Sequence, residues 1–139
     1  GKIFLDTLGK GRLYFKKALN GVTYYIVIRH RNAIETWNIS PSSFSNLYKV
    51  YDFTTAASKA YGNNQIQVDA SPVEFAVYNG DVNQDGAIDL TDLVSVYNDG
   101  NSFLSGYVQT DVNGDNFVDL SDLVITYNNS IACVGVIRP

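Results

Sequence analysis

The sequence predicts a mainly β protein with a small α part: an antiparallel β-sandwich followed by a pair of loop-helix units. Two observations predict this class. Residues 1–79 alternate short β-prone runs with turn residues, and residues 80–139 contain the same acidic stretch twice. We therefore expect two domains, a sandwich over 1–79 and a cation-binding domain over 80–139 that ends in an apolar tail.

β-Branched and aromatic residues dominate the runs of the first part. Turn residues separate these runs, among them Asn20-Gly21, Pro41 and Ser71-Pro72. Frequent turns between short strands are typical of an antiparallel sandwich. One helical turn is expected at 54–61. The expected strands are 2–6, 11–17, 22–30, 33–39, 48–53, 64–68 and 73–78.

The second part is built on a repeat. Residues 81–92 read DVNQDGAIDLTD and residues 111–122 read DVNGDNFVDLSD. Each acidic stretch runs into apolar residues spaced i, i+3, i+4 and i+7, which predicts an amphipathic helix after each stretch. Two loop-helix units that face each other follow from this pattern. The two apolar stripes are Leu90, Leu93, Val94 and Tyr97, and Leu120, Leu123, Val124 and Tyr127.

Acidic side chains this close together repel one another unless a cation lies between them. Their spacing matches the EF-hand loop, in which positions 1, 3, 5, 7, 9 and 12 surround Ca²⁺ with oxygen and position 7 uses its backbone carbonyl. The sequence therefore predicts two calcium ions. The predicted ligands are Asp81, Asn83, Asp85, Ala87, Asp89 and Asp92 in the first loop, and Asp111, Asn113, Asp115, Phe117, Asp119 and Asp122 in the second.

Two further loop positions fit this prediction. Position 6 requires a positive φ, which Gly86 adopts freely and Asn116 tolerates better than other non-glycine residues. We expect Ile88 and Val118 at position 8 to pair as a short two-stranded bridge that couples the loops. The alternative is a pair of acidic, solvated turns. Magnesium is a weaker candidate than calcium because it prefers few protein ligands and strict octahedral geometry.

Residues 80–129 resemble the dockerin family through the duplicated pattern GDVNxDGxxD...DL and Asp at position 12 of both loops. The resemblance implies an extracellular, non-catalytic module of a bacterial protein that binds two calcium ions and docks onto a cohesin domain. The chain departs from the family at positions 10 and 11, where it has Leu90-Thr91 and Leu120-Ser121 instead of a Ser/Thr pair. Calcium binding carries over, whereas cohesin binding does not. We expect Leu90 and Leu120 in the core.

Residues 9–32 resemble a prealbumin-like, carboxypeptidase-regulatory β-sandwich, in which a glycine-rich turn, a strand, Asn-Gly and a Tyr-rich strand follow in order. Such modules begin with a strand that precedes KIFLD, and this chain has none, so an open sheet edge is expected. An open edge accepts a strand from a partner or another copy. The apolar tail 131–137 is one candidate strand. The alternative, which we favour, is that the tail packs against its own calcium domain.

Several function classes are excluded or disfavoured. Residues 80–139 carry one Arg and nine acids, which argues against a nucleic-acid partner. No apolar stretch is long enough to insert in a membrane, and Cys133, the only cysteine, cannot form an intrachain disulfide. No catalytic constellation is visible, so no enzyme is expected. Trp37 and nearby tyrosines offer a sugar-stacking platform, although strand aromatics more often fill a core.

Together these patterns predict a non-catalytic, calcium-binding assembly module of a secreted bacterial protein, located outside the cell or on its surface. It would act by docking to a cohesin-like receptor, or by self-assembly with further copies through strand addition. The alternative is a carbohydrate-binding accessory module of a secreted enzyme.

Overall fold

The computed structural model describes residues 1–6 and 9–139 and shows two compact units. Unit 1 comprises residues 1–24 and 41–51. Unit 2 comprises residues 25–40 and 52–139, so it joins part of the β-rich half to the loop-helix repeat. The expected pair of domains, 1–79 and 80–139, stays a prediction.

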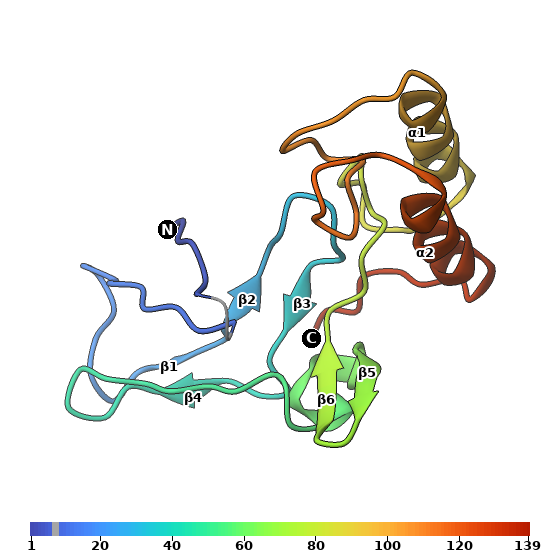
Figure 1. Ribbon diagram of the computed structural model, residues 1–139. Helices are drawn as coiled ribbons and strands as arrows, with labels where there is room; N and C mark the ends of the chain where they lie inside the picture. The colour runs from blue at the N-terminus through green and yellow to red at the C-terminus, as the bar shows by residue number, and fades with distance from the viewer. Residues whose placement is uncertain (7–8) are drawn as a thin grey trace. The chain divides into compact units, whose positions relative to one another are not determined.

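Unit 1 contains one short ribbon, in which β1 (Thr23–Tyr24) pairs antiparallel with β4 (Ser42–Ser43) (Figure 1). The Phe44 ring contacts the ring of Tyr24 edge-on, with 5.9 Å between centroids. No described residue of unit 1 is buried. The predicted strands 2–6, 11–17 and 48–53 are not strands in the structure. Their β-prone residues find no partner strand, and propensity alone does not form a sheet.

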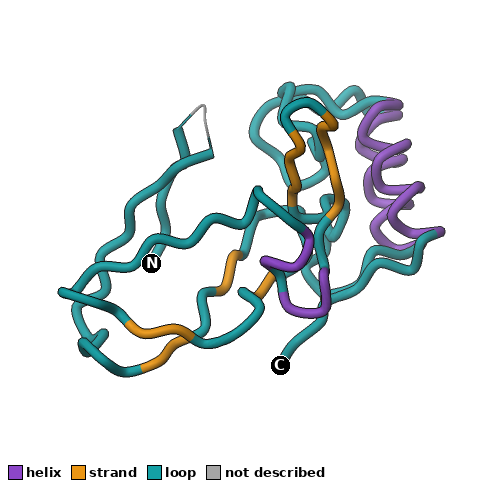
Figure 2. The backbone as a smooth tube through the Cα atoms, turned by 90° about the horizontal axis from the view of Figure 1, so that it is seen from below, coloured by secondary structure: helices purple, strands orange, loops and turns teal. Residues whose placement is uncertain are grey.

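Unit 2 contains two further ribbons. β2 (Val27–Ile28) pairs with β3 (Thr36–Trp37), and β5 (Ile66–Ala70) pairs with β6 (Val73–Ala76), both antiparallel. A short 3₁₀ segment, η1 (Ala57–Lys59), lies within the predicted helical turn, and η2 (Tyr61–Asn63) follows it. Figure 2 shows how short the strands are beside the loops that join them.

The fold class is thus confirmed at a coarse level: small antiparallel sheets together with two helices. The sandwich is not confirmed, since the described strands form only two-stranded sheets. The predicted strand 22–30 is divided between β1 and β2. Between them, the backbone N–H of Ile26 donates to the side-chain Oδ1 of Asn38 at 2.7 Å, so a polar side chain takes a bond that a sheet ladder would otherwise use.

Helices α1 (Leu90–Asn101) and α2 (Leu120–Ile131) confirm the two predicted helices and lie side by side (Figure 1). An apolar core formed largely by valines packs against them. The core consists of Val82, Val96, Val112 and Val118, with Val108, Leu123 and Ile125 packed against it.

No helix within residues 1–6 and 9–139 is long and apolar enough to cross a membrane.

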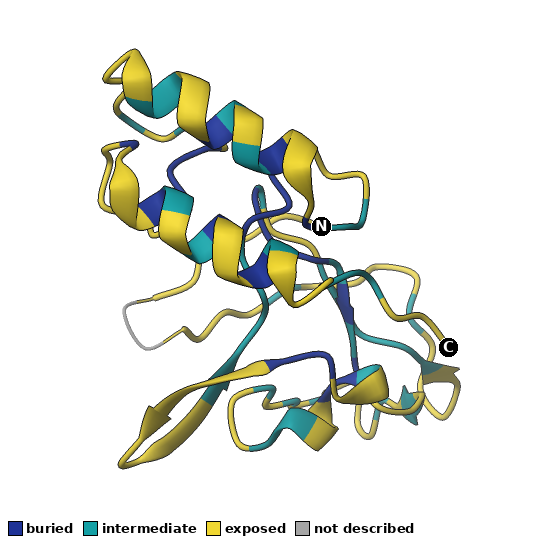
Figure 3. Cartoon of the chain, turned by 90° about the vertical axis from the view of Figure 1, so that its right-hand side faces the viewer, coloured by how far each residue is buried: buried dark blue, intermediate teal, exposed yellow. Residues whose placement is uncertain are grey.

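Most side chains of the predicted apolar stripes do not face this core, although Leu123 packs against it. Leu90 is 68% exposed and Leu120 is 70% exposed, so the expectation that they are buried was wrong. The reason is that Asp92 must point inward to bind the backbone of its own loop, and Val96 lies one turn further on the same face. This orientation turns Leu90 outward. Both helices are exposed over most of their surface, with buried positions at intervals along them (Figure 3).

Candidate functional site: two repeated acidic loops

Each acidic loop ends as the N-terminal cap of its helix. The side chain of Asp89 accepts a hydrogen bond from Thr91 N at 2.7 Å, and Asp119 accepts one from Ser121 N at the same distance. Each helix start is a capping box, because the carboxylate at position 12 accepts the backbone N–H of position 9 in return. Hydrogen bonds from the hydroxyl and then the backbone N–H of Thr91 lower the pKa of Asp89, and the same two bonds from Ser121 lower the pKa of Asp119.

The carboxylates at position 12 are buried and accept backbone hydrogen bonds from their own loops. Asp92 is fully buried, and its Oδ1 accepts the backbone N–H of Val82 at 2.9 Å and of Asn83 at 3.1 Å. Asp122 does the same for the second loop, with distances of 2.7 and 3.0 Å to the corresponding N–H groups. An aspartate at this position is short enough to cap its own helix and reach back to the start of its loop.

Positions 3 and 5 form a second repeated network. In the first loop, Asn83 Nδ2 donates to Asp85 Oδ2 at 2.9 Å, and Asp85 N donates to Asn83 Oδ1 at 2.9 Å. Asn113 and Asp115 make the same two contacts at 2.9 and 2.8 Å. The sequence repeat therefore appears as a repeat of hydrogen bonds, in register.

Position 1 differs between the loops. Asp81 is 2% exposed, and its Oδ1 is buried with no hydrogen-bond partner among the described residues. Burial, together with the charge of Asp92, raises the pKa of Asp81 to about 6. Asp111, by contrast, has a cation beside it, because Arg31 Nη2 lies 3.4 Å from its Oδ2. A buried carboxylate oxygen without a partner is costly unless a cation or donor occupies the space in front of it.

Position 6 has the backbone that the sequence predicts. Gly86 has a φ of 96° and Asn116 a φ of 72°. A β-branched residue would be strained at either site. This part of the prediction is confirmed.

The predicted bridge between Ile88 and Val118 was wrong. Ile88 N instead donates to Val134 O at 2.9 Å, and Val118 N donates to Leu104 O at 3.0 Å. Each loop is therefore closed by the segment that follows the helix of the other loop. Direct pairing is excluded because both position-8 N–H groups are already used in these closures.

The closing segments extend the repeat beyond the part that is visible in sequence. Val136 N donates to Gly86 O at 2.8 Å, and Gly106 N donates to Asn116 O at 2.8 Å. Phe103 and Cys133, at corresponding places after the two helices, both have positive φ, 52° and 53°. The tail 131–137 thus lies against the first loop of its own chain. This is the arrangement that the sequence analysis favoured.

Carboxylate clustering in the structure is limited. No three His, Cys, Asp or Glu side chains in residues 1–6 and 9–139 are grouped closely enough to hold a metal ion. The side chains at positions 3, 5 and 12 accept backbone N–H groups of the loop, and those at position 9 accept a backbone N–H of the helix start; positions 3, 5 and 9 are exposed, whereas position 12 is buried. Ala87 and Phe117 at position 7 form isolated bridges with Gly135 and Ser105.

The sequence analysis missed residues that anchor the loops from outside. Asn32, fully buried, donates through Nδ2 to Asp111 O at 2.7 Å and to Gln109 O at 3.0 Å. Arg31 donates to Val108 O and lies over the Tyr107 ring, 4.3 Å from its centroid. Their signal in sequence was only a polar pair between two strand-like runs, which is too weak to assign a partner.

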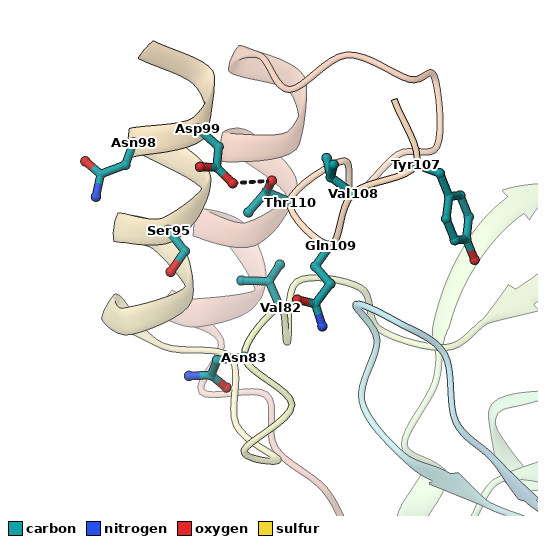
Figure 4. A pocket seen from close by; sticks show the side chains of 9 residues that line it. All are labelled: Val82, Asn83, Ser95, Asn98, Asp99, Tyr107, Val108, Gln109 and Thr110. Carbon is teal, nitrogen blue, oxygen red and sulfur yellow. Dashed lines mark hydrogen bonds between the residues drawn. The ribbon is translucent and has the colours of Figure 1, made fainter. Parts of the chain in front are cut away.

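The last turn of each helix holds the start of a loop. Asp99 Oδ2 accepts the hydroxyl of Thr110, just before the second loop, at 2.7 Å (Figure 4). Asn129, at the corresponding place in α2, donates to Asn79 O, just before the first loop, at 2.7 Å. Each helix is therefore hydrogen-bonded to the chain just before the loop of the other loop-helix unit.

Trp37, named above as part of a possible sugar-stacking platform, contacts neighbouring side chains of unit 2. It is half-buried, its indole N–H donates to Glu35 Oε1 at 2.7 Å, and its ring contacts the Tyr25 ring edge-on, with 5.5 Å between centroids.

Comparisons of this chain with family models, with curated proteins and with solved structures give no match.

Proposed function

We propose that the chain is a non-catalytic assembly module whose two acidic loops each bind one calcium ion. The observation that carries the proposal is the buried Asp81 Oδ1, which has no partner among the described residues and lies in a loop with EF-hand spacing. The repeated network of positions 3, 5 and 12 supports the same role for the second loop. The proposed ligands are those predicted from the sequence at positions 1, 3, 5, 7, 9 and 12 of each loop.

Bound calcium would supply charge neutralisation and structural order. Two ions add four positive charges, which offsets the formal net charge of -4. Because the loops, the helix caps and the closing segments are connected, binding free energy would appear as stability of unit 2. Arg31, beside Asp111, opposes a cation in the second loop, so we expect the first loop to bind more tightly.

The assembly role rests on exposed apolar side chains that both helices repeat. Val94 and Tyr97 on α1 correspond to Val124 and Tyr127 on α2, and all are exposed. With the exposed leucines at each helix start, they form two matched stripes, which are typical of a protein-binding surface. We propose a protein partner for these stripes and, with the dockerin resemblance, a location outside the cell.

Thermal unfolding tests the calcium proposal. We expect calcium to raise the melting temperature, because one ion at 100 times its dissociation constant adds about 2.7 kcal/mol to the free energy of unfolding. Magnesium at the same concentration should raise it less. The double variant Asp81→Asn with Asp111→Asn should lose the calcium-dependent rise.

The matched control is Asp69→Asn with Glu74→Gln, which removes two carboxylates outside the loops and should keep the rise. An equal rise in wild type and in the loop variant would reject the loops as the calcium sites.

A further inference from the structure

Residues 11–17 of unit 1, here called the basic segment, have strand-like sequence and no strand partner. They read GRLYFKK; residues 11–14 take part in no backbone–backbone hydrogen bond within the described residues, and Lys16 and Lys17 lie in a turn. Tyr14 is 81% exposed and Phe15 is 55% exposed. Because unit 1 buries none of its described residues, it gains little from folding alone, and an added contact would stabilise it.

The β5–β6 hairpin of unit 2 is an incomplete sheet. A two-stranded ribbon is marginally stable by itself and gains from a third strand. The β6 side is covered in part, since Phe75 N donates to Thr54 O at 2.8 Å. On the β5 side, the described residues supply no backbone hydrogen bond from outside the hairpin. All residues of β5 are exposed, and they include the apolar Ile66 and Val68.

The two surfaces carry opposite charges. The basic segment contains Arg12, Lys16 and Lys17 and no acid, which gives +3, and Lys10 directly precedes it. Residues 62–79 contain two acids and no Lys or Arg, which gives −2. These acids, Asp69 and Glu74, stand directly opposite each other across the hairpin, and neither is in an ion pair within the described part of the chain. Like charges in that position destabilise a ribbon unless a cation lies beside them.

We propose that the basic segment of one copy adds as a third strand to the β5 edge of a second copy. The addition would satisfy unpaired backbone groups on both surfaces, cover Ile66 and Val68, and place lysines beside the opposed carboxylates. The basic segment and the β5 edge are different surfaces of one chain, so the contact is heterologous. Each dimer therefore keeps one basic segment and one β5 edge unoccupied, and further copies can add head to tail. The tail 131–137 is not needed as a donor. This inference goes beyond calcium binding by the loops and does not depend on it.

Sedimentation velocity of the full chain in millimolar calcium, over a range of concentrations, tests the proposal. We expect the wild type to form species larger than a monomer in increasing amounts, and added salt to reduce them. The variant Lys16→Glu with Lys17→Glu, and separately Asp69→Lys with Glu74→Lys, should each weaken association by about tenfold or more, since each places like charges at the contact. Combining all four substitutions in one chain should restore association.

The control Lys2→Glu with Lys49→Glu changes the charge of unit 1 equally and leaves the basic segment intact, so its association should match wild type. A wild type that remains monomeric at every concentration overturns the proposal, as does association that neither charge reversal weakens. A quadruple variant that remains monomeric while its melting temperature matches wild type also overturns it. Loss of calcium binding would be detected separately, by the calcium-dependent melting temperature.

Discussion

Replacing Asp92 with alanine is expected to destabilise unit 2 by about 2–4 kcal/mol, even when calcium is chelated, because the backbone N–H groups of Val82, Asn83 and Asp89 lose the carboxylate as acceptor. Val82 is buried, and its N–H keeps only the contact with Gly80 O at 3.0 Å. The same substitution removes a predicted calcium ligand, so the stabilisation by calcium at the first loop should disappear as well. Urea unfolding with and without chelator measures both effects.

Asp92→Asn separates the two roles. The amide keeps one oxygen acceptor at nearly the same place, so we expect a smaller loss of stability in chelator than for alanine, together with a similar loss of calcium stabilisation. Asp122→Ala is the matched change in the second loop and should act alike. If Asp92→Ala were as stable as wild type in chelator, the described role of this carboxylate in closing its loop would be wrong.

Removing residues 134–139 is expected to weaken the first loop and to leave the second loop intact. The deletion eliminates two backbone hydrogen bonds to the first loop, from Ile88 N to Val134 O and from Val136 N to Gly86 O, and the bond from Asn64 Nδ2 to Gly135 O. At about 1 kcal/mol each, these bonds account for about 3 kcal/mol. Hydrogen exchange should show faster exchange at Ile88 and unchanged exchange at Val118.

Deleting only Arg138 and Pro139 is the control. It shortens the chain and removes the contact of Arg138 with Glu35, but it leaves the closing hydrogen bonds in place. Ile88 should then exchange as slowly as in wild type. Equal protection of Ile88 in the deletion that starts at 134 would show that the tail does not close the loop in solution.

The sequence predicted the second half better than the first. Loop spacing, helix starts and the positive φ of Gly86 and Asn116 follow from local rules: ligand spacing, capping chemistry and backbone freedom. The helix faces did not follow, because the inward direction is set by Asp92, whose three backbone partners lie in its own loop and helix cap. Hydrophobic spacing alone assigned Leu90 to the wrong side.

The loop closures and the first half depend on non-local contacts. Val134 pairs with Ile88 and Leu104 with Val118. The sequence marked the tail around Val134 as a candidate strand but did not identify its partner, and nothing near Leu104 marks it as a strand. In the first half, β propensity alone led to the prediction of strands at residues 2–6 and 11–17, although a strand also needs a partner strand. Asn32 illustrates the same limit, because its carbonyl partners come from residues 109 and 111.

Calorimetric titration of the full chain with calcium tests the central claim most directly. We predict two ions per chain, with the tighter site lost in Asp81→Asn and the weaker site lost in Asp111→Asn, since Arg31 lies beside Asp111 alone. Heat changes that fit two sites and respond to these variants would support the account. No binding, or binding that both variants leave unchanged, would contradict it.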